Sequence, residues 1–150
     1  MHPKQTELFS AYEDAFYNVN ENCKIYMNQV LYKLSSNYYR TENEHIVKEI
    51  NSLLVWPKTN EKINDTINYY LNEATVSASS IKNLVVFGNV NMGDTSGSKS
   101  AKVLPNLEVV DMSSFTGKLG TYTFYECRNL KTVITSLNLS QIPGQCFMYC

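Results

Sequence analysis

The sequence of 150 residues contains no long hydrophobic run. Its longest apolar stretches are short pieces such as Leu53–Trp56 and Leu84–Phe87, far below the ~20 residues that a helix needs to cross a bilayer. The opening segment, Met1–Glu7, lacks the hydrophobic core of a secretory signal peptide. We therefore expect no membrane insertion and no signal peptide in this sequence. The compartment stays open.

The sequence also lacks an excess of either positive or negative charge. Thirteen basic and fourteen acidic residues give a net charge of -1. The lysines are scattered rather than grouped into a stripe, so no segment has the electrostatic character that attracts a phosphate backbone. We expect no nucleic-acid partner.

Cysteine is scarce, with four residues at 23, 127, 146 and 150. They are too few and too clustered for a disulfide scaffold, and no Cys-x-x-Cys pair of the kind common in zinc sites occurs. We predict no metal site. Cys127 and Cys150 hold the same place in a repeat, which favours reduced thiols packed in a core. Stacked repeats would also bring these two sulfurs near each other, so a disulfide stays open.

Signals of catalysis are weak. The segment Gly93–Ser100 nearly spells a phosphate-binding loop, but that motif needs a glycine directly before the lysine and this chain has Ser98. The two histidines, His2 and His45, have no serine and aspartate at a spacing that indicates a nucleophile. We predict that the protein is not an enzyme, with no catalytic residues, no cofactor-binding residues and no cofactor.

What the sequence does contain is a 23-residue period. Asn-Leu pairs begin at positions 83, 106 and 129, and residues 106–128 (the first window) superimpose on residues 129–150 (the second window) without a gap. This similarity predicts a solenoid, in which each coil buries its apolar side against its neighbours. The identical pairs are Asn106 and Asn129, Leu107 and Leu130, Val110 and Val133, Ser113 and Ser136, Phe124 and Phe147, and Cys127 and Cys150.

Residues 1–75 are predicted to be a helical N-terminal segment that caps the repeats. Thr41–Glu44 has the form of a capping box, and Pro57 ends the helix that it opens. Apolar residues recur at helical spacing in four groups. These are Leu8, Phe9, Tyr12 and Phe16; Met27, Val30, Leu31 and Leu34; Ile46, Val47, Ile50, Leu53 and Leu54; and Ile63, Ile67, Tyr70 and Leu71.

A β-type pattern starts at Ile81 and becomes regular from Leu104, after a loop rich in Gly, Ser and Asn. The predicted class is α+β, with a helical segment at 1–75 followed at 81–150 by short parallel strands, one in each coil of about 23 residues. If the two windows stack in register, Glu108 lies beside Lys131 at the ~4.8 Å spacing of paired strands.

The second repeat carries a recognisable motif. The segment Cys127–Val133 spells Cys-x-x-Leu-x-x-Val, and Ile142 and the ending Cys146–Cys150 follow it. These windows resemble the BspA-like class of leucine-rich repeats, although Thr123 and Cys146 replace the usual alanine before phenylalanine. The resemblance covers residues 81–150, and it implies a non-catalytic protein-binding solenoid of the kind often displayed on cell surfaces and used in adhesion.

The leading interpretation is a module that binds a protein or a glycan of unknown identity. One alternative is an accessory repeat region of an enzyme whose catalytic part lies outside this sequence. Another is a structural segment that associates with itself through an open C-terminal coil, because we expect the repeat array to be truncated after Cys150. The default binding face is the outward side of the two predicted strands: Val109, Asp111, Ser113, Thr132, Ile134 and Ser136.

Overall fold

The computed structural model of the chain describes residue 22 and residues 25–28, 46–49, 51–95 and 103–150. The chain divides into two units, Pro3–Ile50 and Asn51–Cys150, each considered by itself. In the first unit, strands β1 (Ile25–Asn28) and β2 (Ile46–Glu49) form a parallel pair.

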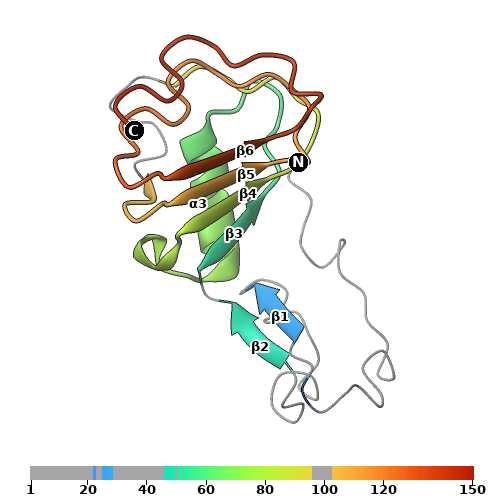
Figure 1. The fold of residues 1–150 in the computed structure, drawn as a ribbon, viewed down its shortest axis with the longest axis vertical. Helices are drawn as coiled ribbons and strands as arrows, with labels where there is room; N and C mark the ends of the chain where they lie inside the picture. The colour runs from blue at the N-terminus through green and yellow to red at the C-terminus, as the bar shows by residue number, and fades with distance from the viewer. Residues whose placement is uncertain (1–21, 23–24, 29–45, 50, 96–102) are drawn as a thin grey trace. The chain divides into compact units, whose positions relative to one another are not determined.

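The second unit is built around a four-stranded parallel sheet in the order β3-β4-β5-β6. Figure 1 shows helix α3 lying against one face of this sheet. The fold is therefore mixed α+β, as the sequence predicted. The elements are β3 (Ser52–Val55), α3 (Ile63–Ala74), the short 3-10 helix η2 (Ala78–Ser80), β4 (Asn83–Val86), β5 (Val109–Met112) and β6 (Thr132–Thr135).

Helix α3 confirms the last of the predicted helices. Ile63, Ile67 and Tyr70 recur at helical spacing, and all three are buried on the side that meets the sheet. The helix ends at Ala74, and its C-cap residue Thr75 adopts the left-handed conformation with a φ of 54°. It forms the crossover between β3 and β4, the kind of connection that two parallel strands require.

One other predicted helix is wrong: the segment expected to be one helix from Thr41 to Leu54 contains β2 and the start of β3. Of the helix predicted around Met27, this residue lies in β1, and Val30, Leu31 and Leu34 lie outside the described residues. Along β3, Leu53 and Val55 are buried whereas Ser52 and Leu54 are half-buried, the alternation of a strand. Pairing with β4 makes this segment a strand, and a pattern of neighbouring residues cannot predict a partner that lies so far along the chain. The predicted helix over residues 8–16 lies outside the described residues.

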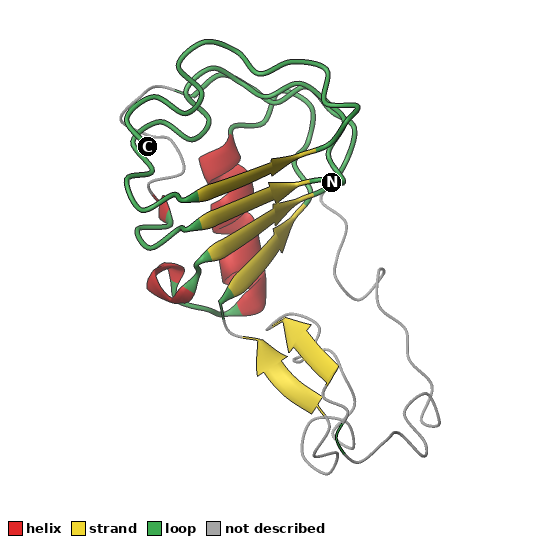
Figure 2. Cartoon of the chain, viewed as in Figure 1, coloured by secondary structure: helices red, strands yellow, loops and turns green. Residues whose placement is uncertain are grey.

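The 23-residue register is confirmed where the two windows meet. Val109 of β5 pairs with Thr132 of β6, and the same offset continues past the strands at Lys118 and Gln141. The predicted neighbours Glu108 and Lys131 form an ion pair, with 2.8 Å between Oε2 and Nζ. In Figure 2 the loops that follow β5 and β6 run side by side, as stacked repeats require.

The Asn-Leu pair at position 83 does not belong to that register. Leu84 pairs with Val110, and this offset along the chain is longer than the one from Val110 to Val133, so Asn83 and Leu84 lie inside β4 and not before it. With this longer offset the counterpart of Leu107 is Ile81, and both side chains are buried, at 1% and 0% exposure. The identical spacing of the first pair is therefore a coincidence of sequence.

The core continues from the space between α3 and the sheet to the space beneath the connecting loops. Phe115, Leu119 and Phe124 lie in the loops that follow β5, and all three are fully buried. Aromatic rings add to this core near the helix, where Trp56 stacks on Phe87 with a centroid distance of 4.7 Å.

Candidate functional site

The face of the sheet opposite α3 presents two rows of side chains. Register places one residue of each strand in each row, so the rows cross all four strands. Along β3, β4 and β5 these residues are half-buried and alternate with buried ones, while all of β6 is exposed. The first row is Ser52, Asn83, Val109 and Thr132, and the second is Leu54, Val85, Asp111 and Ile134.

Four of the six residues predicted for the binding face lie in these rows. Val109 pairs with Thr132, and Asp111 pairs with Ile134, whose exposed fraction is 43%. The remaining two, Ser113 and Ser136, follow the strands and take part in local turns. The Ser113 amide donates to Asp111 Oδ1 at 2.8 Å, and the amide of Asn138 donates to Ser136 Oγ at 3.0 Å. The binding role of all six stays a prediction.

Sequence reasoning missed the half of this surface that belongs to β3 and β4. Ser52 and Leu54 were assigned to a helix, and Asn83 was aligned with the wrong position of the repeat. The β-type pattern that starts at Ile81 does predict a strand at β4, but it does not separate the outward Asn83 and Val85 from the buried Leu84 and Val86.

A charged ridge borders the rows at the beginning of the strands. The Glu108 carboxylate forms two ion pairs, with Lys82 Nζ at 3.2 Å and with Lys131 Nζ at 2.8 Å. Hydrogen bonds from Lys131 and then Lys82 hold the pKa of the Glu108 carboxyl below its ordinary value. A shallow polar pocket of about 360 Å³ opens here, lined by these three residues together with Asn106 and Asn129.

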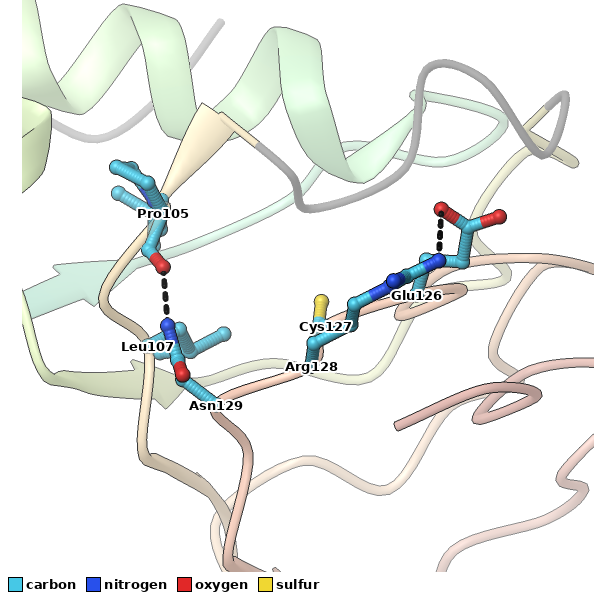
Figure 3. A pocket seen from close by; sticks show the side chains of 7 residues that line it. Pro105, Leu107, Glu126, Cys127, Arg128 and Asn129 are labelled. Atoms are coloured by element: carbon cyan, nitrogen blue, oxygen red, sulfur yellow. Dashed lines mark hydrogen bonds and ion pairs between the residues drawn. The ribbon is translucent and has the colours of Figure 1, made fainter.

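A second pocket, of about 340 Å³, lies beside the repeated asparagine and is drawn in Figure 3. Asn129 Nδ2 donates to the carbonyl oxygen of Pro105 at 2.8 Å, and Asn106 Nδ2 makes the equivalent bond to Ser79 at 2.7 Å. These amides connect each repeat to the one before it, which is a structural role. The pocket is lined by Leu104, Pro105, Leu107, Glu126, Cys127, Arg128 and Asn129.

Cys127 and Cys146 are buried, whereas Cys150, which was predicted to pack in a core as Cys127 does, is exposed. Burial raises the pKa of the Cys146 thiol to about 11, and burial also raises the pKa of Cys150, whose Sγ donates to the carbonyl of Phe124 at 3.0 Å. Cys127, Cys146 and Cys150 form no disulfide. Within the described ranges no cluster of three metal-ligating side chains occurs, and both histidines lie outside those ranges.

Among the described residues, no helix has both the length and the apolar character needed to cross a bilayer. Comparison of the chain with family models, with curated proteins and with solved structures finds no match.

Proposed function

We propose that the chain is a non-catalytic recognition module, a BspA-like leucine-rich-repeat solenoid that binds a protein through the outward rows of its parallel sheet. Adhesion at a cell surface is the setting that the family resemblance implies. The observation that carries the proposal is the contrast between the two sides of the sheet.

On the inner side, the first position along the register repeats the same chemistry, while the second changes from valine in β3 and β4 to Met112 and Thr135 in β5 and β6. Leu53, Leu84 and Val110 are aliphatic and fully buried, as a scaffold requires. On the outer side the chemistry changes from strand to strand, for example from Val85 to Asp111. A mostly apolar interior beneath a variable surface is typical of repeat proteins that bind through an extended face.

The composition of the outer rows favours a protein ligand over a glycan. Leu54, Val85 and Ile134 lie in one row and give it an aliphatic character, although the row faces away from the core. The mostly polar first row separates this apolar strip from the charged ridge of Lys82, Glu108 and Lys131. An apolar centre with a polar rim is the usual anatomy of a protein interface.

The test compares two arginine variants of matched charge in screens against protein and glycan arrays. Ile134→Arg alters the outer row of the exposed strand β6, whereas Asn91→Arg alters an exposed loop position away from the sheet. We expect a protein that the wild-type chain binds to lose at least about tenfold in affinity with Ile134→Arg, equivalent to about 1.4 kcal/mol, and to keep its affinity with Asn91→Arg. Binding that survives Ile134→Arg unchanged, or binding of glycans alone, would contradict this assignment.

A further inference from the structure

Two pockets lie next to each other where the chain enters strands β5 and β6. The polar pocket of about 360 Å³ is lined by Lys82, Asn106, Glu108, Asn129 and Lys131. Asn129 also lines the pocket of about 340 Å³ that Figure 3 shows. We call the two pockets together the entry groove. Successive coils of the array thus contribute to one recess.

The backbone holds the charged side chains of the entry groove next to one another. The Glu108 amide donates to the Lys82 carbonyl at 2.7 Å, and the Lys131 amide donates to the Glu108 carbonyl at 2.8 Å. The two lysines therefore lie on either side of one carboxylate, each about 4.8 Å from it along the sheet. A ligand that binds here meets an arrangement that is already ordered, which lowers the entropic cost of binding.

Positive charge projects farther into solvent from the entry groove than negative charge does. The side chains of Lys82, Lys131 and Arg128 are 52%, 70% and 77% exposed. The side chains with which they pair, Glu108 and Glu126, are only 29% and 23% exposed. A partner that approaches from solvent meets the ammonium and guanidinium groups first. Charge complementarity therefore favours an acidic partner.

The exposure of these cations is a property of inner coils too. Strand β4, which Lys82 precedes, is paired on both sides, with β3 and with β5. Lys82 is nevertheless half exposed, so neighbouring coils do not cover a side chain at this position. The entry groove is therefore a feature of the side of the array and not of an end of it.

The pocket of Figure 3 adds an apolar surface to the charged one. Leu104, Leu107 and Cys127 line it and are at most 6% exposed. On the other side of the pocket Arg128 reaches towards Glu126, with 3.7 Å between the paired atoms. A peptide can supply an acidic and an aliphatic side chain together. A nucleic-acid backbone supplies dense phosphate charge, which the recessed carboxylates would repel.

We propose that the entry groove binds an acidic segment of a protein partner. A carboxylate of that segment lies between Lys82 and Lys131, on the solvent side of Glu108, and a neighbouring aliphatic side chain contacts the pocket wall at Leu107. An ammonium group has three N–H donors, so a lysine that is paired with Glu108 can still donate to the ligand. The proposal does not rest on the function assigned to the outward rows, because the mostly polar first row separates the entry groove from their apolar strip.

The experiment measures binding of the full chain to a short fluorescent peptide of alternating glutamate and alanine by fluorescence anisotropy. A peptide with glutamine in place of glutamate and a single-stranded oligothymidylate are the comparison probes. We expect the acidic peptide to bind with a dissociation constant of about 10 to 100 µM, and the other two probes to bind at least about tenfold more weakly. Added salt should weaken binding of the acidic peptide because it screens exposed charges.

Two variants of the ridge should change this affinity in opposite directions. Lys82→Met should weaken binding about threefold, the effect of losing one exposed ion pair. Glu108→Gln should strengthen binding about threefold, because it removes a carboxylate that competes with the ligand for both lysines. Lys118→Met, at an exposed lysine of the loop after β5, is the matched control and should leave the affinity unchanged. Circular dichroism shows whether each variant is folded.

A wild-type chain that does not bind the acidic peptide overturns the proposal. Equal binding of the glutamine peptide, or tighter binding of the oligothymidylate, also overturns it. So does a folded Glu108→Gln chain that binds the acidic peptide more weakly than the wild type, because Glu108 would then be part of the site and not a competitor. None of these outcomes depends on Ile134→Arg, so the function proposed for the outward rows is tested separately.

Discussion

The ring of Phe124 lies parallel to the ring of Phe147, with 5.3 Å between centroids and 5° between planes. The two residues hold the same position in successive windows, so equivalent side chains of the two repeats contact each other directly. Tyr122 and Gln145 follow the same period in the backbone, since both adopt a left-handed conformation with φ values of 60° and 63°. The two windows thus share local backbone geometry as well as sequence.

The phenylalanine pair predicts unequal costs of truncation. Phe124→Ala should lower the free energy of unfolding by roughly 3–5 kcal/mol, because it removes a fully buried ring from the core. Phe147→Ala, in the second window, should cost roughly 1–2 kcal/mol because its ring is already partly exposed. Urea unfolding at low protein concentration measures both. Equal costs would show that the second window is covered as well as the first.

Close backbone approach predicts a position where a single methyl group is harmful. A Cβ at Gly120 would overlap the carbonyl oxygen of Gly93 in the preceding loop, whereas a Cβ at Gly144 would meet no atom within 4 Å. Gly120→Ala should therefore destabilise the fold by about 1–3 kcal/mol or more, and Gly144→Ala should stay within about 0.5 kcal/mol. Thermal and urea unfolding of the two variants give the comparison. If Gly120→Ala is neutral, the loops do not stack as described.

The charged ridge predicts a depressed carboxyl pKa at Glu108. Its folded-state value lies below the ordinary glutamate value because Lys131 and Lys82 donate to the charged form. The stabilisation is therefore present above the unfolded-state pKa and is lost as the pH falls through the folded-state pKa. Titration of the Glu108 carboxyl followed by NMR should find this low pKa, and added salt should raise it.

Lys131→Met should move that pKa upward, and Lys118→Met, at an exposed lysine of the following loop, serves as the control. If the pKa of Glu108 is the same in Lys131→Met as in the wild type, the ion pair does not form. The register that places the two residues side by side would then also be wrong.

The cysteines predict an order of alkylation. At pH 8 the buried Cys146 thiol, with a pKa of about 11, holds almost no thiolate and should react slowly with iodoacetamide. The more exposed Cys150 should react faster, although burial raises its pKa as well. Mass spectrometry of peptides after brief labelling measures the order, and unfolding in urea should abolish it. Faster labelling of Cys146 would contradict its position in the core.

How much of the fold could be predicted from the sequence depends on the range of the signal. Helix α3 could be predicted because Ile63, Ile67 and Tyr70 recur at helical spacing among polar residues over about two turns. Strand β3 could not, because Leu53 and Leu54 suit a helical stripe as well as a strand. The segment becomes a strand because it pairs with β4, which follows it in the chain only after α3 and η2.

The candidate site divides in the same way. The faces of β5 and β6 could be predicted because identical residues such as Val110 and Val133 fix their register. The faces of β3 and β4 could not be read from that period, because the offset from Leu84 to Val110 is longer than the offset from Val110 to Val133. The Asn-Leu pair at 83 obscures this difference in offset. It lies 23 residues before the next pair, but it lies inside its strand, whereas the pair at 106 precedes its strand.

Amide hydrogen exchange of the chain, followed residue by residue by NMR at low concentration, tests the stacked windows most directly. The amides of Leu119, Phe124 and Glu126 donate into the second window, and their counterparts one repeat later have no such window to enter within the described ranges. We predict that each of the three exchanges at least about tenfold more slowly than its counterpart at Ile142, Phe147 or Tyr149. Equal exchange within the three pairs would contradict the account, because it would mean that the second window does not cover the first.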